Sequence, residues 1–206
     1  MAHPLNRRDF VKSATVLSFG LATTGLAPRL RAASSPGNKL VVAVLGMGRG
    51  FDHVKALQQI DGVEIAYLCD VDESRFARVV KSFDGKKQSA PKTVKDFRTI
   101  LDDKSVDAIF VATPNFWHAP ITILACAAGK HVYVEKPGSH NPQEGEWMVA
   151  AARKHARVVQ MGNQRRSWPG VIEGIAKLKA GAIGKVTFAR GFYTNARTTI
   201  GHGKPA

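Results

Sequence analysis

One stretch of the sequence constrains the fold more than any other: six apolar residues at 40–45, followed directly by Gly46-Met47-Gly48-Arg49-Gly50. An unbroken apolar run that ends at a glycine is typical of a strand buried on both faces of a parallel sheet. The glycines allow a tight turn into a helix, which we expect to reach Ile60, and they let the backbone approach an anion at the positive helix N-terminus. The third glycine of the usual pattern would fall at position 51, where this chain has Phe51, so the turn alone is a weak indication.

A second predicted strand, at 63–69, ends at Asp70, which lies 22 residues after Gly48. That offset is the one expected for a carboxylate that bonds the ribose of a dinucleotide. A carboxylate there would repel a 2′-phosphate, so Asp70 favours NAD over NADP. The alternative is that Asp70 only caps a helix that begins near Glu73.

The rest of the chain continues to alternate between helical and strand-like patterns. The expected helices are 94–101, 120–128 and 141–155, and the expected strands are 106–112, 131–134 and 157–161. This alternation predicts an α/β fold, a Rossmann-type doubly wound parallel sheet. Ligands of such sheets bind outside the carboxyl ends of the strands. Two unusual sequences fall at those ends, residues 112–118 and Glu135-Lys136-Pro137.

The first 35 residues differ in kind from the remainder. Residues 6–12, Asn-Arg-Arg-Asp-Phe-Val-Lys, resemble the twin-arginine export motif. The mildly apolar stretch that follows would span about 21 Å as a helix, short of the roughly 30 Å of a bilayer core. We therefore expect a signal peptide with a linker, export to the periplasm and no stable membrane anchor; an ordinary amphipathic helix is the alternative.

Composition bears on the partners of the chain. Hydrophobic residues make up 44% and charged residues 22%, which argues against disorder and a polytopic membrane protein. The net charge of +14 would suit nucleic acid, but the basic residues are scattered, so no nucleic-acid partner is expected. Cys69 and Cys126 are expected in the core, and the histidine spacing predicts no metal site.

Several segments together resemble the Gfo/Idh/MocA oxidoreductases, the family of glucose-fructose oxidoreductase and inositol dehydrogenase. The most specific are Asp70-Val71-Asp72, Ala112-Thr113-Pro114 with Asn115 and His118, Gly129-Lys130-His131-Val132, Glu135-Lys136-Pro137 and residues 160–166. The resemblance runs from about Lys39 to Thr194. It implies an NAD-dependent oxidoreductase that transfers a hydride between a sugar or polyol hydroxyl carbon and the nicotinamide.

The resemblance also implies which residues form the site. Gly46, Gly48, Arg49 and Asp70 would hold the adenosine diphosphate half of the cofactor; Thr113, Pro114, Asn115 and His118 would border the nicotinamide; Glu135 and Lys136 would lie beside nicotinamide and substrate. Lys136 would act as a base or as a stabilising cation, with His118 as a second catalytic candidate. A cis bond before Pro137 would aim Lys136 into the site. The alternatives are a surface Lys136 paired with Glu135 and a His118 that only begins a helix.

We expect three parts: the signal peptide and linker at 1–35, the cofactor domain at 36–162, and the start of an α+β substrate domain at 163–206. The third part is predicted to hold a helix at 168–180 and a strand at 184–193. By the family pattern this domain completes the substrate site and the interface of a homo-oligomer, so the chain is expected to be truncated, and whether it is active alone stays open. An NAD-dependent glycosidase, which oxidises one sugar carbon transiently, and a non-catalytic NAD-binding fragment stay open.

Overall fold

The computed structural model describes residues 39–194 and 196. The segment expected to be a twin-arginine signal, residues 1–35, lies outside the described residues. The element order is β1 (Leu40–Leu45), α2 (Gly50–Leu57), β2 (Val63–Cys69), η1 (Glu73–Arg75), α3 (Phe76–Val80), η2 (Lys81–Phe83), β3 (Lys92–Val94), α4 (Arg98–Asp102), β4 (Ala108–Val111), η3 (Asn115–Trp117), α5 (His118–Ala127), β5 (His131–Val134), α6 (Pro142–Lys154), β6 (Val159–Met161), η4 (Gln164–Ser167) and α7 (Pro169–Lys179).

The six strands form one parallel sheet in the order β3-β2-β1-β4-β5-β6. This is the strand order of a Rossmann fold, so the predicted fold class is confirmed. The order reverses at β1, because the chain runs from β1 through β2 to β3 on one side and resumes with β4 on the other. The crevice between β1 and β4 is therefore where such a sheet binds its ligand.

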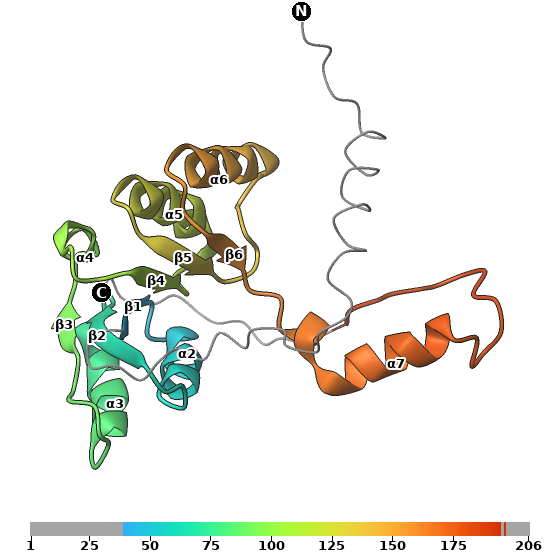
Figure 1. Cartoon of the computed structure of the whole chain (residues 1–206), viewed down its shortest axis with the longest axis horizontal. Helices are drawn as coiled ribbons and strands as arrows, with labels where there is room; N and C mark the ends of the chain where they lie inside the picture. Colours follow the sequence, from blue (N-terminus) through green and yellow to red (C-terminus); the bar gives the residue numbers. More distant parts are fainter. Residues whose placement is uncertain (1–38, 195, 197–206) are drawn as a thin grey trace, which may run out of the picture. The chain divides into compact units, whose positions relative to one another are not determined.

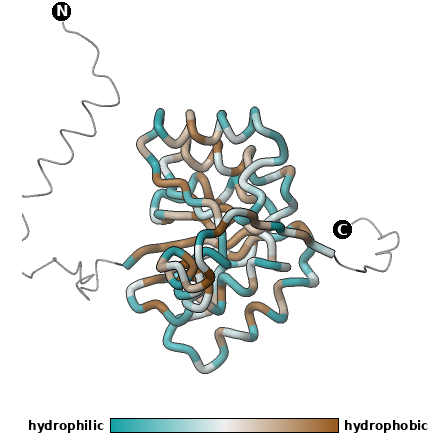
Figure 2. The backbone as a smooth tube through the Cα atoms, turned by 90° about the vertical axis from the view of Figure 1, so that its right-hand side faces the viewer, coloured by the Kyte–Doolittle hydropathy of each residue, from teal (hydrophilic) through white to brown (hydrophobic). Residues whose placement is uncertain are grey.

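Helices cover both faces of the sheet, α5 and α6 on one face and α2 and α3 on the other (Figure 1). Successive residues of β1 alternate between the two cores, with Ala43 and Leu45 in one and Val42 and Val44 in the other. All four are at most 1% exposed. The hydropathy-coloured tube shows brown, apolar segments in the middle of the fold (Figure 2). Burial on both faces explains why the strand is apolar without interruption.

The cysteines lie in the core, as predicted. Cys69 ends β2 and Cys126 lies in α5; both are buried and neither forms a disulfide. Burial, with a smaller effect of the Asp70 charge, raises the pKa of the Cys69 thiol to about 12. A thiol held in its neutral form is a poor nucleophile, so Cys69 serves packing and not chemistry.

Side chains cap the start of α6. Asn141 accepts a hydrogen bond from the Glu144 main-chain N–H at 3.0 Å, and Pro142 occupies the first turn. The Glu144 carboxylate reaches back to the His140 N–H at 2.9 Å. These contacts supply partners to main-chain donors at the helix start that would otherwise lack them.

The prediction of a helix at 94–101 is wrong in its first half. Residues Lys92–Val94 form the edge strand β3, paired with β2, and α4 begins only at Arg98. Between them, Asp96 accepts from the Arg98 N–H at 2.9 Å and ends the extended segment. A strand of three residues is too short to show an alternating pattern in the sequence. This strand forms because β2 lies beside it.

The predicted helix at 168–180 is confirmed as α7, but the predicted strand at 184–193 is wrong: these residues form no strand. A period-two pattern indicates which side chains share a face, whereas a strand also needs a hydrogen-bonded neighbour. Within the described residues no neighbouring strand lies beside this segment.

Candidate functional site

The glycine turn joins β1 to α2, and it depends on the absence of a side chain at Gly46 and at Gly50. Gly46 has φ +86°, and a Cβ there would lie 2.5 Å from the carbonyl oxygen of Ala112, in the loop after β4. Gly50 donates to the Gly46 carbonyl at 2.9 Å and opens α2. A Cβ on Gly50 would lie 2.9 Å from Val44 Cγ1, so Gly50 provides the close helix–strand packing that the usual third glycine provides.

Gly48 differs from its neighbours because the protein leaves space beside it. A Cβ built on Gly48 would meet one group only, Nη1 of Arg75 at 3.4 Å, an ordinary van der Waals distance. Gly48 is also exposed. The fold therefore does not require glycine here, whereas a ligand that approaches the backbone at the start of α2 would.

Asp70 lies at the carboxyl end of β2 and faces this turn. Its Oδ2 accepts from the Met47 N–H at 2.6 Å, and its Oδ1 accepts from the Asp72 N–H at 3.0 Å. The cap of the following helix is Asp72, whose carboxylate accepts from the Ser74 N–H at 3.1 Å. The capping alternative for Asp70 is therefore wrong, and its carboxylate lies against the glycine turn.

The loop after β4 carries Thr113, Pro114 and Asn115. The hydroxyl oxygen of Thr113 is buried and has no hydrogen-bond partner in the described protein. His118, the first residue of α5, is only 2% exposed. Its Nδ1 lies 2.6 Å from the Pro137 carbonyl oxygen and its Nε2 lies 2.9 Å from the Thr113 carbonyl oxygen. Both partners are acceptors, so a neutral ring donates to one of them and lies close to the other, which places the ring between the two loops.

The loop after β5 carries Glu135, Lys136 and Pro137. The bond between Lys136 and Pro137 is cis, as predicted. Lys136 is exposed, and among the described residues its ammonium has no ion-pair partner. Lys136 thus lies at the surface, as the alternative expected, but its side chain does not pair with Glu135; only the Lys136 N–H contacts Glu135, at 3.1 Å.

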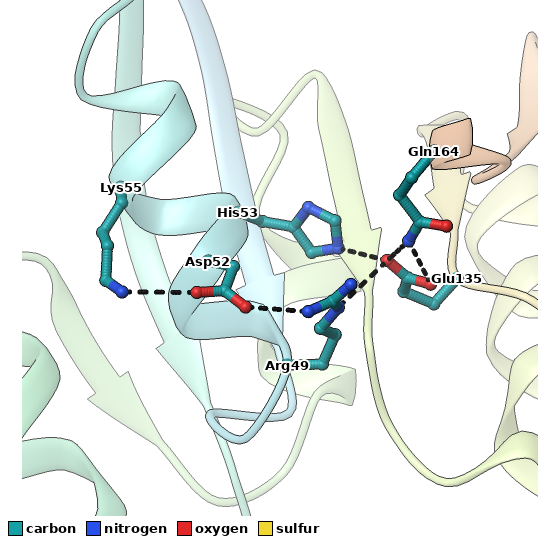
Figure 3. Close-up of polar contacts among 6 residues, drawn as sticks. All are labelled: Arg49, Asp52, His53, Lys55, Glu135 and Gln164. Carbon is teal, nitrogen blue, oxygen red and sulfur yellow. Dashed lines mark hydrogen bonds and ion pairs between the residues drawn. The ribbon is translucent and has the colours of Figure 1, made fainter. Parts of the chain in front are cut away.

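Glu135 is 4% exposed and pairs with residues from other elements (Figure 3). The Gln164 amide donates to both carboxylate oxygens, at 2.8 and 3.0 Å. Arg49 Nε lies 3.8 Å from Oε1 and His53 Nε2 lies 3.1 Å from it. The His53 contact has the distance of an ion pair, although the ring orientation does not complete a hydrogen bond. A buried carboxylate needs such partners, because desolvation disfavours its charge.

Arg49 is held on two sides. Its Nη1 lies 2.9 Å from Asp52 Oδ2, and Asp52 also pairs with Lys55 at 3.3 Å. These contacts lower the pKa of the Asp52 carboxyl, the hydrogen bond from Lys55 being the largest cause. The guanidinium of the glycine turn thus lies between an exposed and a buried carboxylate (Figure 3).

The structure adds three residues that the sequence analysis did not assign to the site: His53, Gln164 and Arg75. His53 lies four residues after Arg49 on α2, so the helical repeat places them on one side. Gln164 lies in a segment that resembles the family, but that resemblance assigned it no role. For Arg75 the sequence holds no signal, because its approach to Gly48 depends on how η1 packs.

Two features are absent from the described residues, 39–194 and 196. No group of three or more His, Cys, Asp or Glu side chains there could hold a metal ion. No helix among them is long and apolar enough to cross a membrane.

Comparison with known proteins identifies relatives of this arrangement. Residues 40–163 match the model of the Gfo/Idh/MocA proteins, described as an oxidoreductase family with an NAD-binding Rossmann fold. The chain is 31% identical over 175 residues to glycosyl hydrolase family 109 protein 1 of Shewanella sp. strain ANA-3, covering 74% of this chain and 38% of the relative. It is 30% identical over 184 residues to the alpha-N-acetylgalactosaminidase of Shewanella oneidensis, covering 78% and 40%.

A solved structure shares the fold. Myo-inositol 2-dehydrogenase from Lactobacillus plantarum matches with a TM-score of 0.64 at 27% identity, covering 72% of this chain and 43% of that protein. The chain thus spans about two fifths of the length of these relatives. The matched family segment includes the glycine turn, Asp70 and the loops after β4 and β5. This segment is therefore a Rossmann domain of the kind that binds a nicotinamide dinucleotide.

Proposed function

The chain belongs to the Gfo/Idh/MocA oxidoreductase family, and from that premise we propose that it serves hydride transfer between NAD and a hydroxyl-bearing carbon of a sugar or polyol. One observation carries the proposal: the glycine turn, Asp70, the Thr113 loop and Lys136 all follow the carboxyl ends of strands in one parallel sheet. Groups placed this way can reach one extended dinucleotide and the substrate beside it.

The glycine turn and Asp70 would hold the adenosine diphosphate half. The open space at Gly48 suits a pyrophosphate against the N-terminus of α2, and the unpartnered Thr113 hydroxyl offers a donor and an acceptor farther along the edge. Asp70 supports NAD over NADP, because a carboxylate repels a 2′-phosphate. A fluorescence titration with both reduced nucleotides tests this preference: equal affinities would refute it.

The nicotinamide, when bound, takes up or returns the hydride. Oxidation of an alcohol also releases the hydroxyl proton, and Lys136 is the residue that we assign to receive it or to stabilise the alkoxide. Its exposed side chain has no ion-pair partner among the described residues, so no carboxylate holds it away from a substrate. His118 is assigned a positioning role, because both ring nitrogens face main-chain carbonyl oxygens.

The second candidate is an NAD-dependent glycosidase, favoured by the names of two relatives that match three quarters of this chain. The two functions share the oxidation of one sugar carbon and differ in their net products. A dehydrogenase forms one NADH for each substrate oxidised, whereas a glycosidase that oxidises and then reduces the same sugar forms none.

Product analysis tests these functions. The purified chain is incubated with NAD and a panel of sugars, polyols and nitrophenyl glycosides, and NADH and nitrophenol are measured together. Stoichiometric NADH supports the dehydrogenase; NAD-dependent nitrophenol without net NADH supports the glycosidase. A chain that binds NADH and forms neither product is a non-catalytic nucleotide-binding fragment, and the proposed function is refuted for it.

Gly48→Ala tests the cofactor site itself. Because the protein leaves space there, the free energy of unfolding should change by less than about 1 kcal/mol. The new methyl group would occupy the surface that the pyrophosphate approaches, so the Kd for NADH should rise by about tenfold or more, the equivalent of about 1.4 kcal/mol. Gly170→Ala is the matched control, since a Cβ there meets nothing within 4 Å. Unchanged NADH affinity in Gly48→Ala would contradict the assignment of this turn.

A further inference from the structure

The carboxylate of Glu135 is engaged by the protein. Gln164 donates to both oxygens, the Lys136 N–H donates to Oε2, and His53 and Arg49 approach Oε1. With 4% of Glu135 exposed, little of it is left for a ligand. The group therefore acts on other residues of the chain.

The partners of Glu135 come from separate elements, as Figure 3 shows. Arg49 belongs to the glycine turn and His53 to α2, whereas Gln164 lies in η4, after the last strand. In the described segment 163–192, the hydrogen bonds that reach back to the sheet are the two made by the Gln164 amide. Every residue of that segment is exposed. The amide of Gln164 is thus the polar link between this segment and Glu135, in the loop after β5.

We infer that Gln164 and Glu135 are a positioning pair: their amide–carboxylate bond fixes the segment that follows β6 against the glycine turn, and the Glu135 charge holds Arg49 and His53 at the same point. The pair would serve the proposed function by placing the segment that leads to the substrate, and in that one respect the inference rests on the proposed function. Neither residue donates or accepts a reacting proton. Their effect passes through the placement of the residues they contact.

His53 reports on this arrangement. Burial lowers the pKa of its imidazole, and the rings of Phe110 and Tyr133 pack against it. The Glu135 charge opposes that lowering by favouring the protonated ring. The other charged groups that face His53 have smaller effects: Arg49 lowers its pKa and Asp52 raises it. Removal of the Glu135 charge should therefore lower the His53 titration midpoint further.

The first measurement is the NMR titration of His53 in the nucleotide-free 206-residue chain, with the resonance identified by its loss in His53→Asn. Glu135→Gln keeps the shape and removes the charge, so the midpoint should fall. Asp52→Asn is the matched control: it removes the other carboxylate at Arg49, yet Asp52 is the smallest influence on His53. A midpoint that moves as far in Asp52→Asn as in Glu135→Gln would overturn the role of the Glu135 charge.

The second measurement is hydrogen exchange at the Arg166 and Trp168 amides, which bond to carbonyls within and beside η4. Gln164→Ala removes the link, so exchange should accelerate by about tenfold or more, since hydrogen bonds to charged groups are among the stronger ones. Gln164→Glu should do the same by placing two carboxylates together. Glu135→Gln combined with Gln164→Glu restores an amide–carboxylate pair with the direction reversed and should recover protection.

The outcomes separate this inference from the proposed function. Unchanged exchange in Gln164→Ala, or no recovery in the double variant, would overturn the positioning pair even in a chain that binds NADH. A chain that fails to bind NADH would instead refute the proposed function, while both readouts here are taken without nucleotide and would still support the pair.

Discussion

Gly46→Ala is expected to lower the free energy of unfolding by about 3–5 kcal/mol, a loss large enough to unfold a marginally stable domain. Two costs add. The methyl group would lie 2.5 Å from the Ala112 carbonyl oxygen and 2.8 Å from the Thr113 nitrogen, both main-chain atoms that cannot rotate away. The backbone at φ +86° also disfavours any residue with a side chain. Urea unfolding followed by circular dichroism measures the change.

Gly62→Ala separates these two costs. Gly62 has nearly the same backbone, φ +79°, and a Cβ there meets nothing within 4 Å. It should therefore lose only the conformational part, about 1–2 kcal/mol. Similar losses in the two variants would show that the approach of the glycine turn to the loop after β4 does not matter, and that conformation alone accounts for Gly46.

The parts of the fold that could be predicted from the sequence are those set by neighbouring residues along the chain. The buried strand β1 has a continuous apolar run because both of its faces are covered, and the glycines follow β1 as Asp70 follows β2, at a fixed spacing. These features are local along the chain, so the pattern alone predicts a doubly wound parallel sheet and one edge of the site, whereas the order of the strands comes from the structure. The cis bond before Pro137 followed from the family motif and is present.

What escaped prediction depends on neighbours distant in the sequence. The edge strand β3 exists because Lys92–Val94 pairs with β2, and residues 184–193 form no strand because none lies beside them within the described residues. The contact between Glu135 and Gln164 joins residues 29 positions apart across the end of the sheet. No periodicity of a single segment contains that information, since it arises only when the strands are aligned.

The role of His118 in the site also could not be predicted from the sequence. From the sequence it is a polar residue at a helix start, equally suited to catalysis or to capping. In the structure its ring lies between the carbonyl of Thr113, in the loop after β4, and that of Pro137, in the loop that carries Lys136. A ring with both nitrogens so placed holds these loops at a fixed separation, which is what a precise site requires.

His118→Leu is therefore expected to affect more than turnover. The leucine side chain fills much of the same space but cannot donate, so the polar contacts of the buried ring with the Thr113 and Pro137 carbonyls are lost. Loss of a hydrogen bond made by a buried group should lower the free energy of unfolding by about 1–3 kcal/mol. The Kd for NADH should rise by about tenfold or more, because both loops lose their common support. Urea unfolding and NADH fluorescence titration measure the two effects.

His118→Gln is the matched control, because its amide can donate to one of the two carbonyls and should recover part of the stability and of the NADH affinity. A residue that served only as a base would behave differently. Its replacement by leucine would abolish turnover while the unfolding free energy and the NADH affinity stayed near their original values. That result would return His118 to catalysis, whereas loss of stability and affinity together, with partial recovery in the glutamine variant, assigns it to holding the loop after β4 beside the loop that carries Lys136.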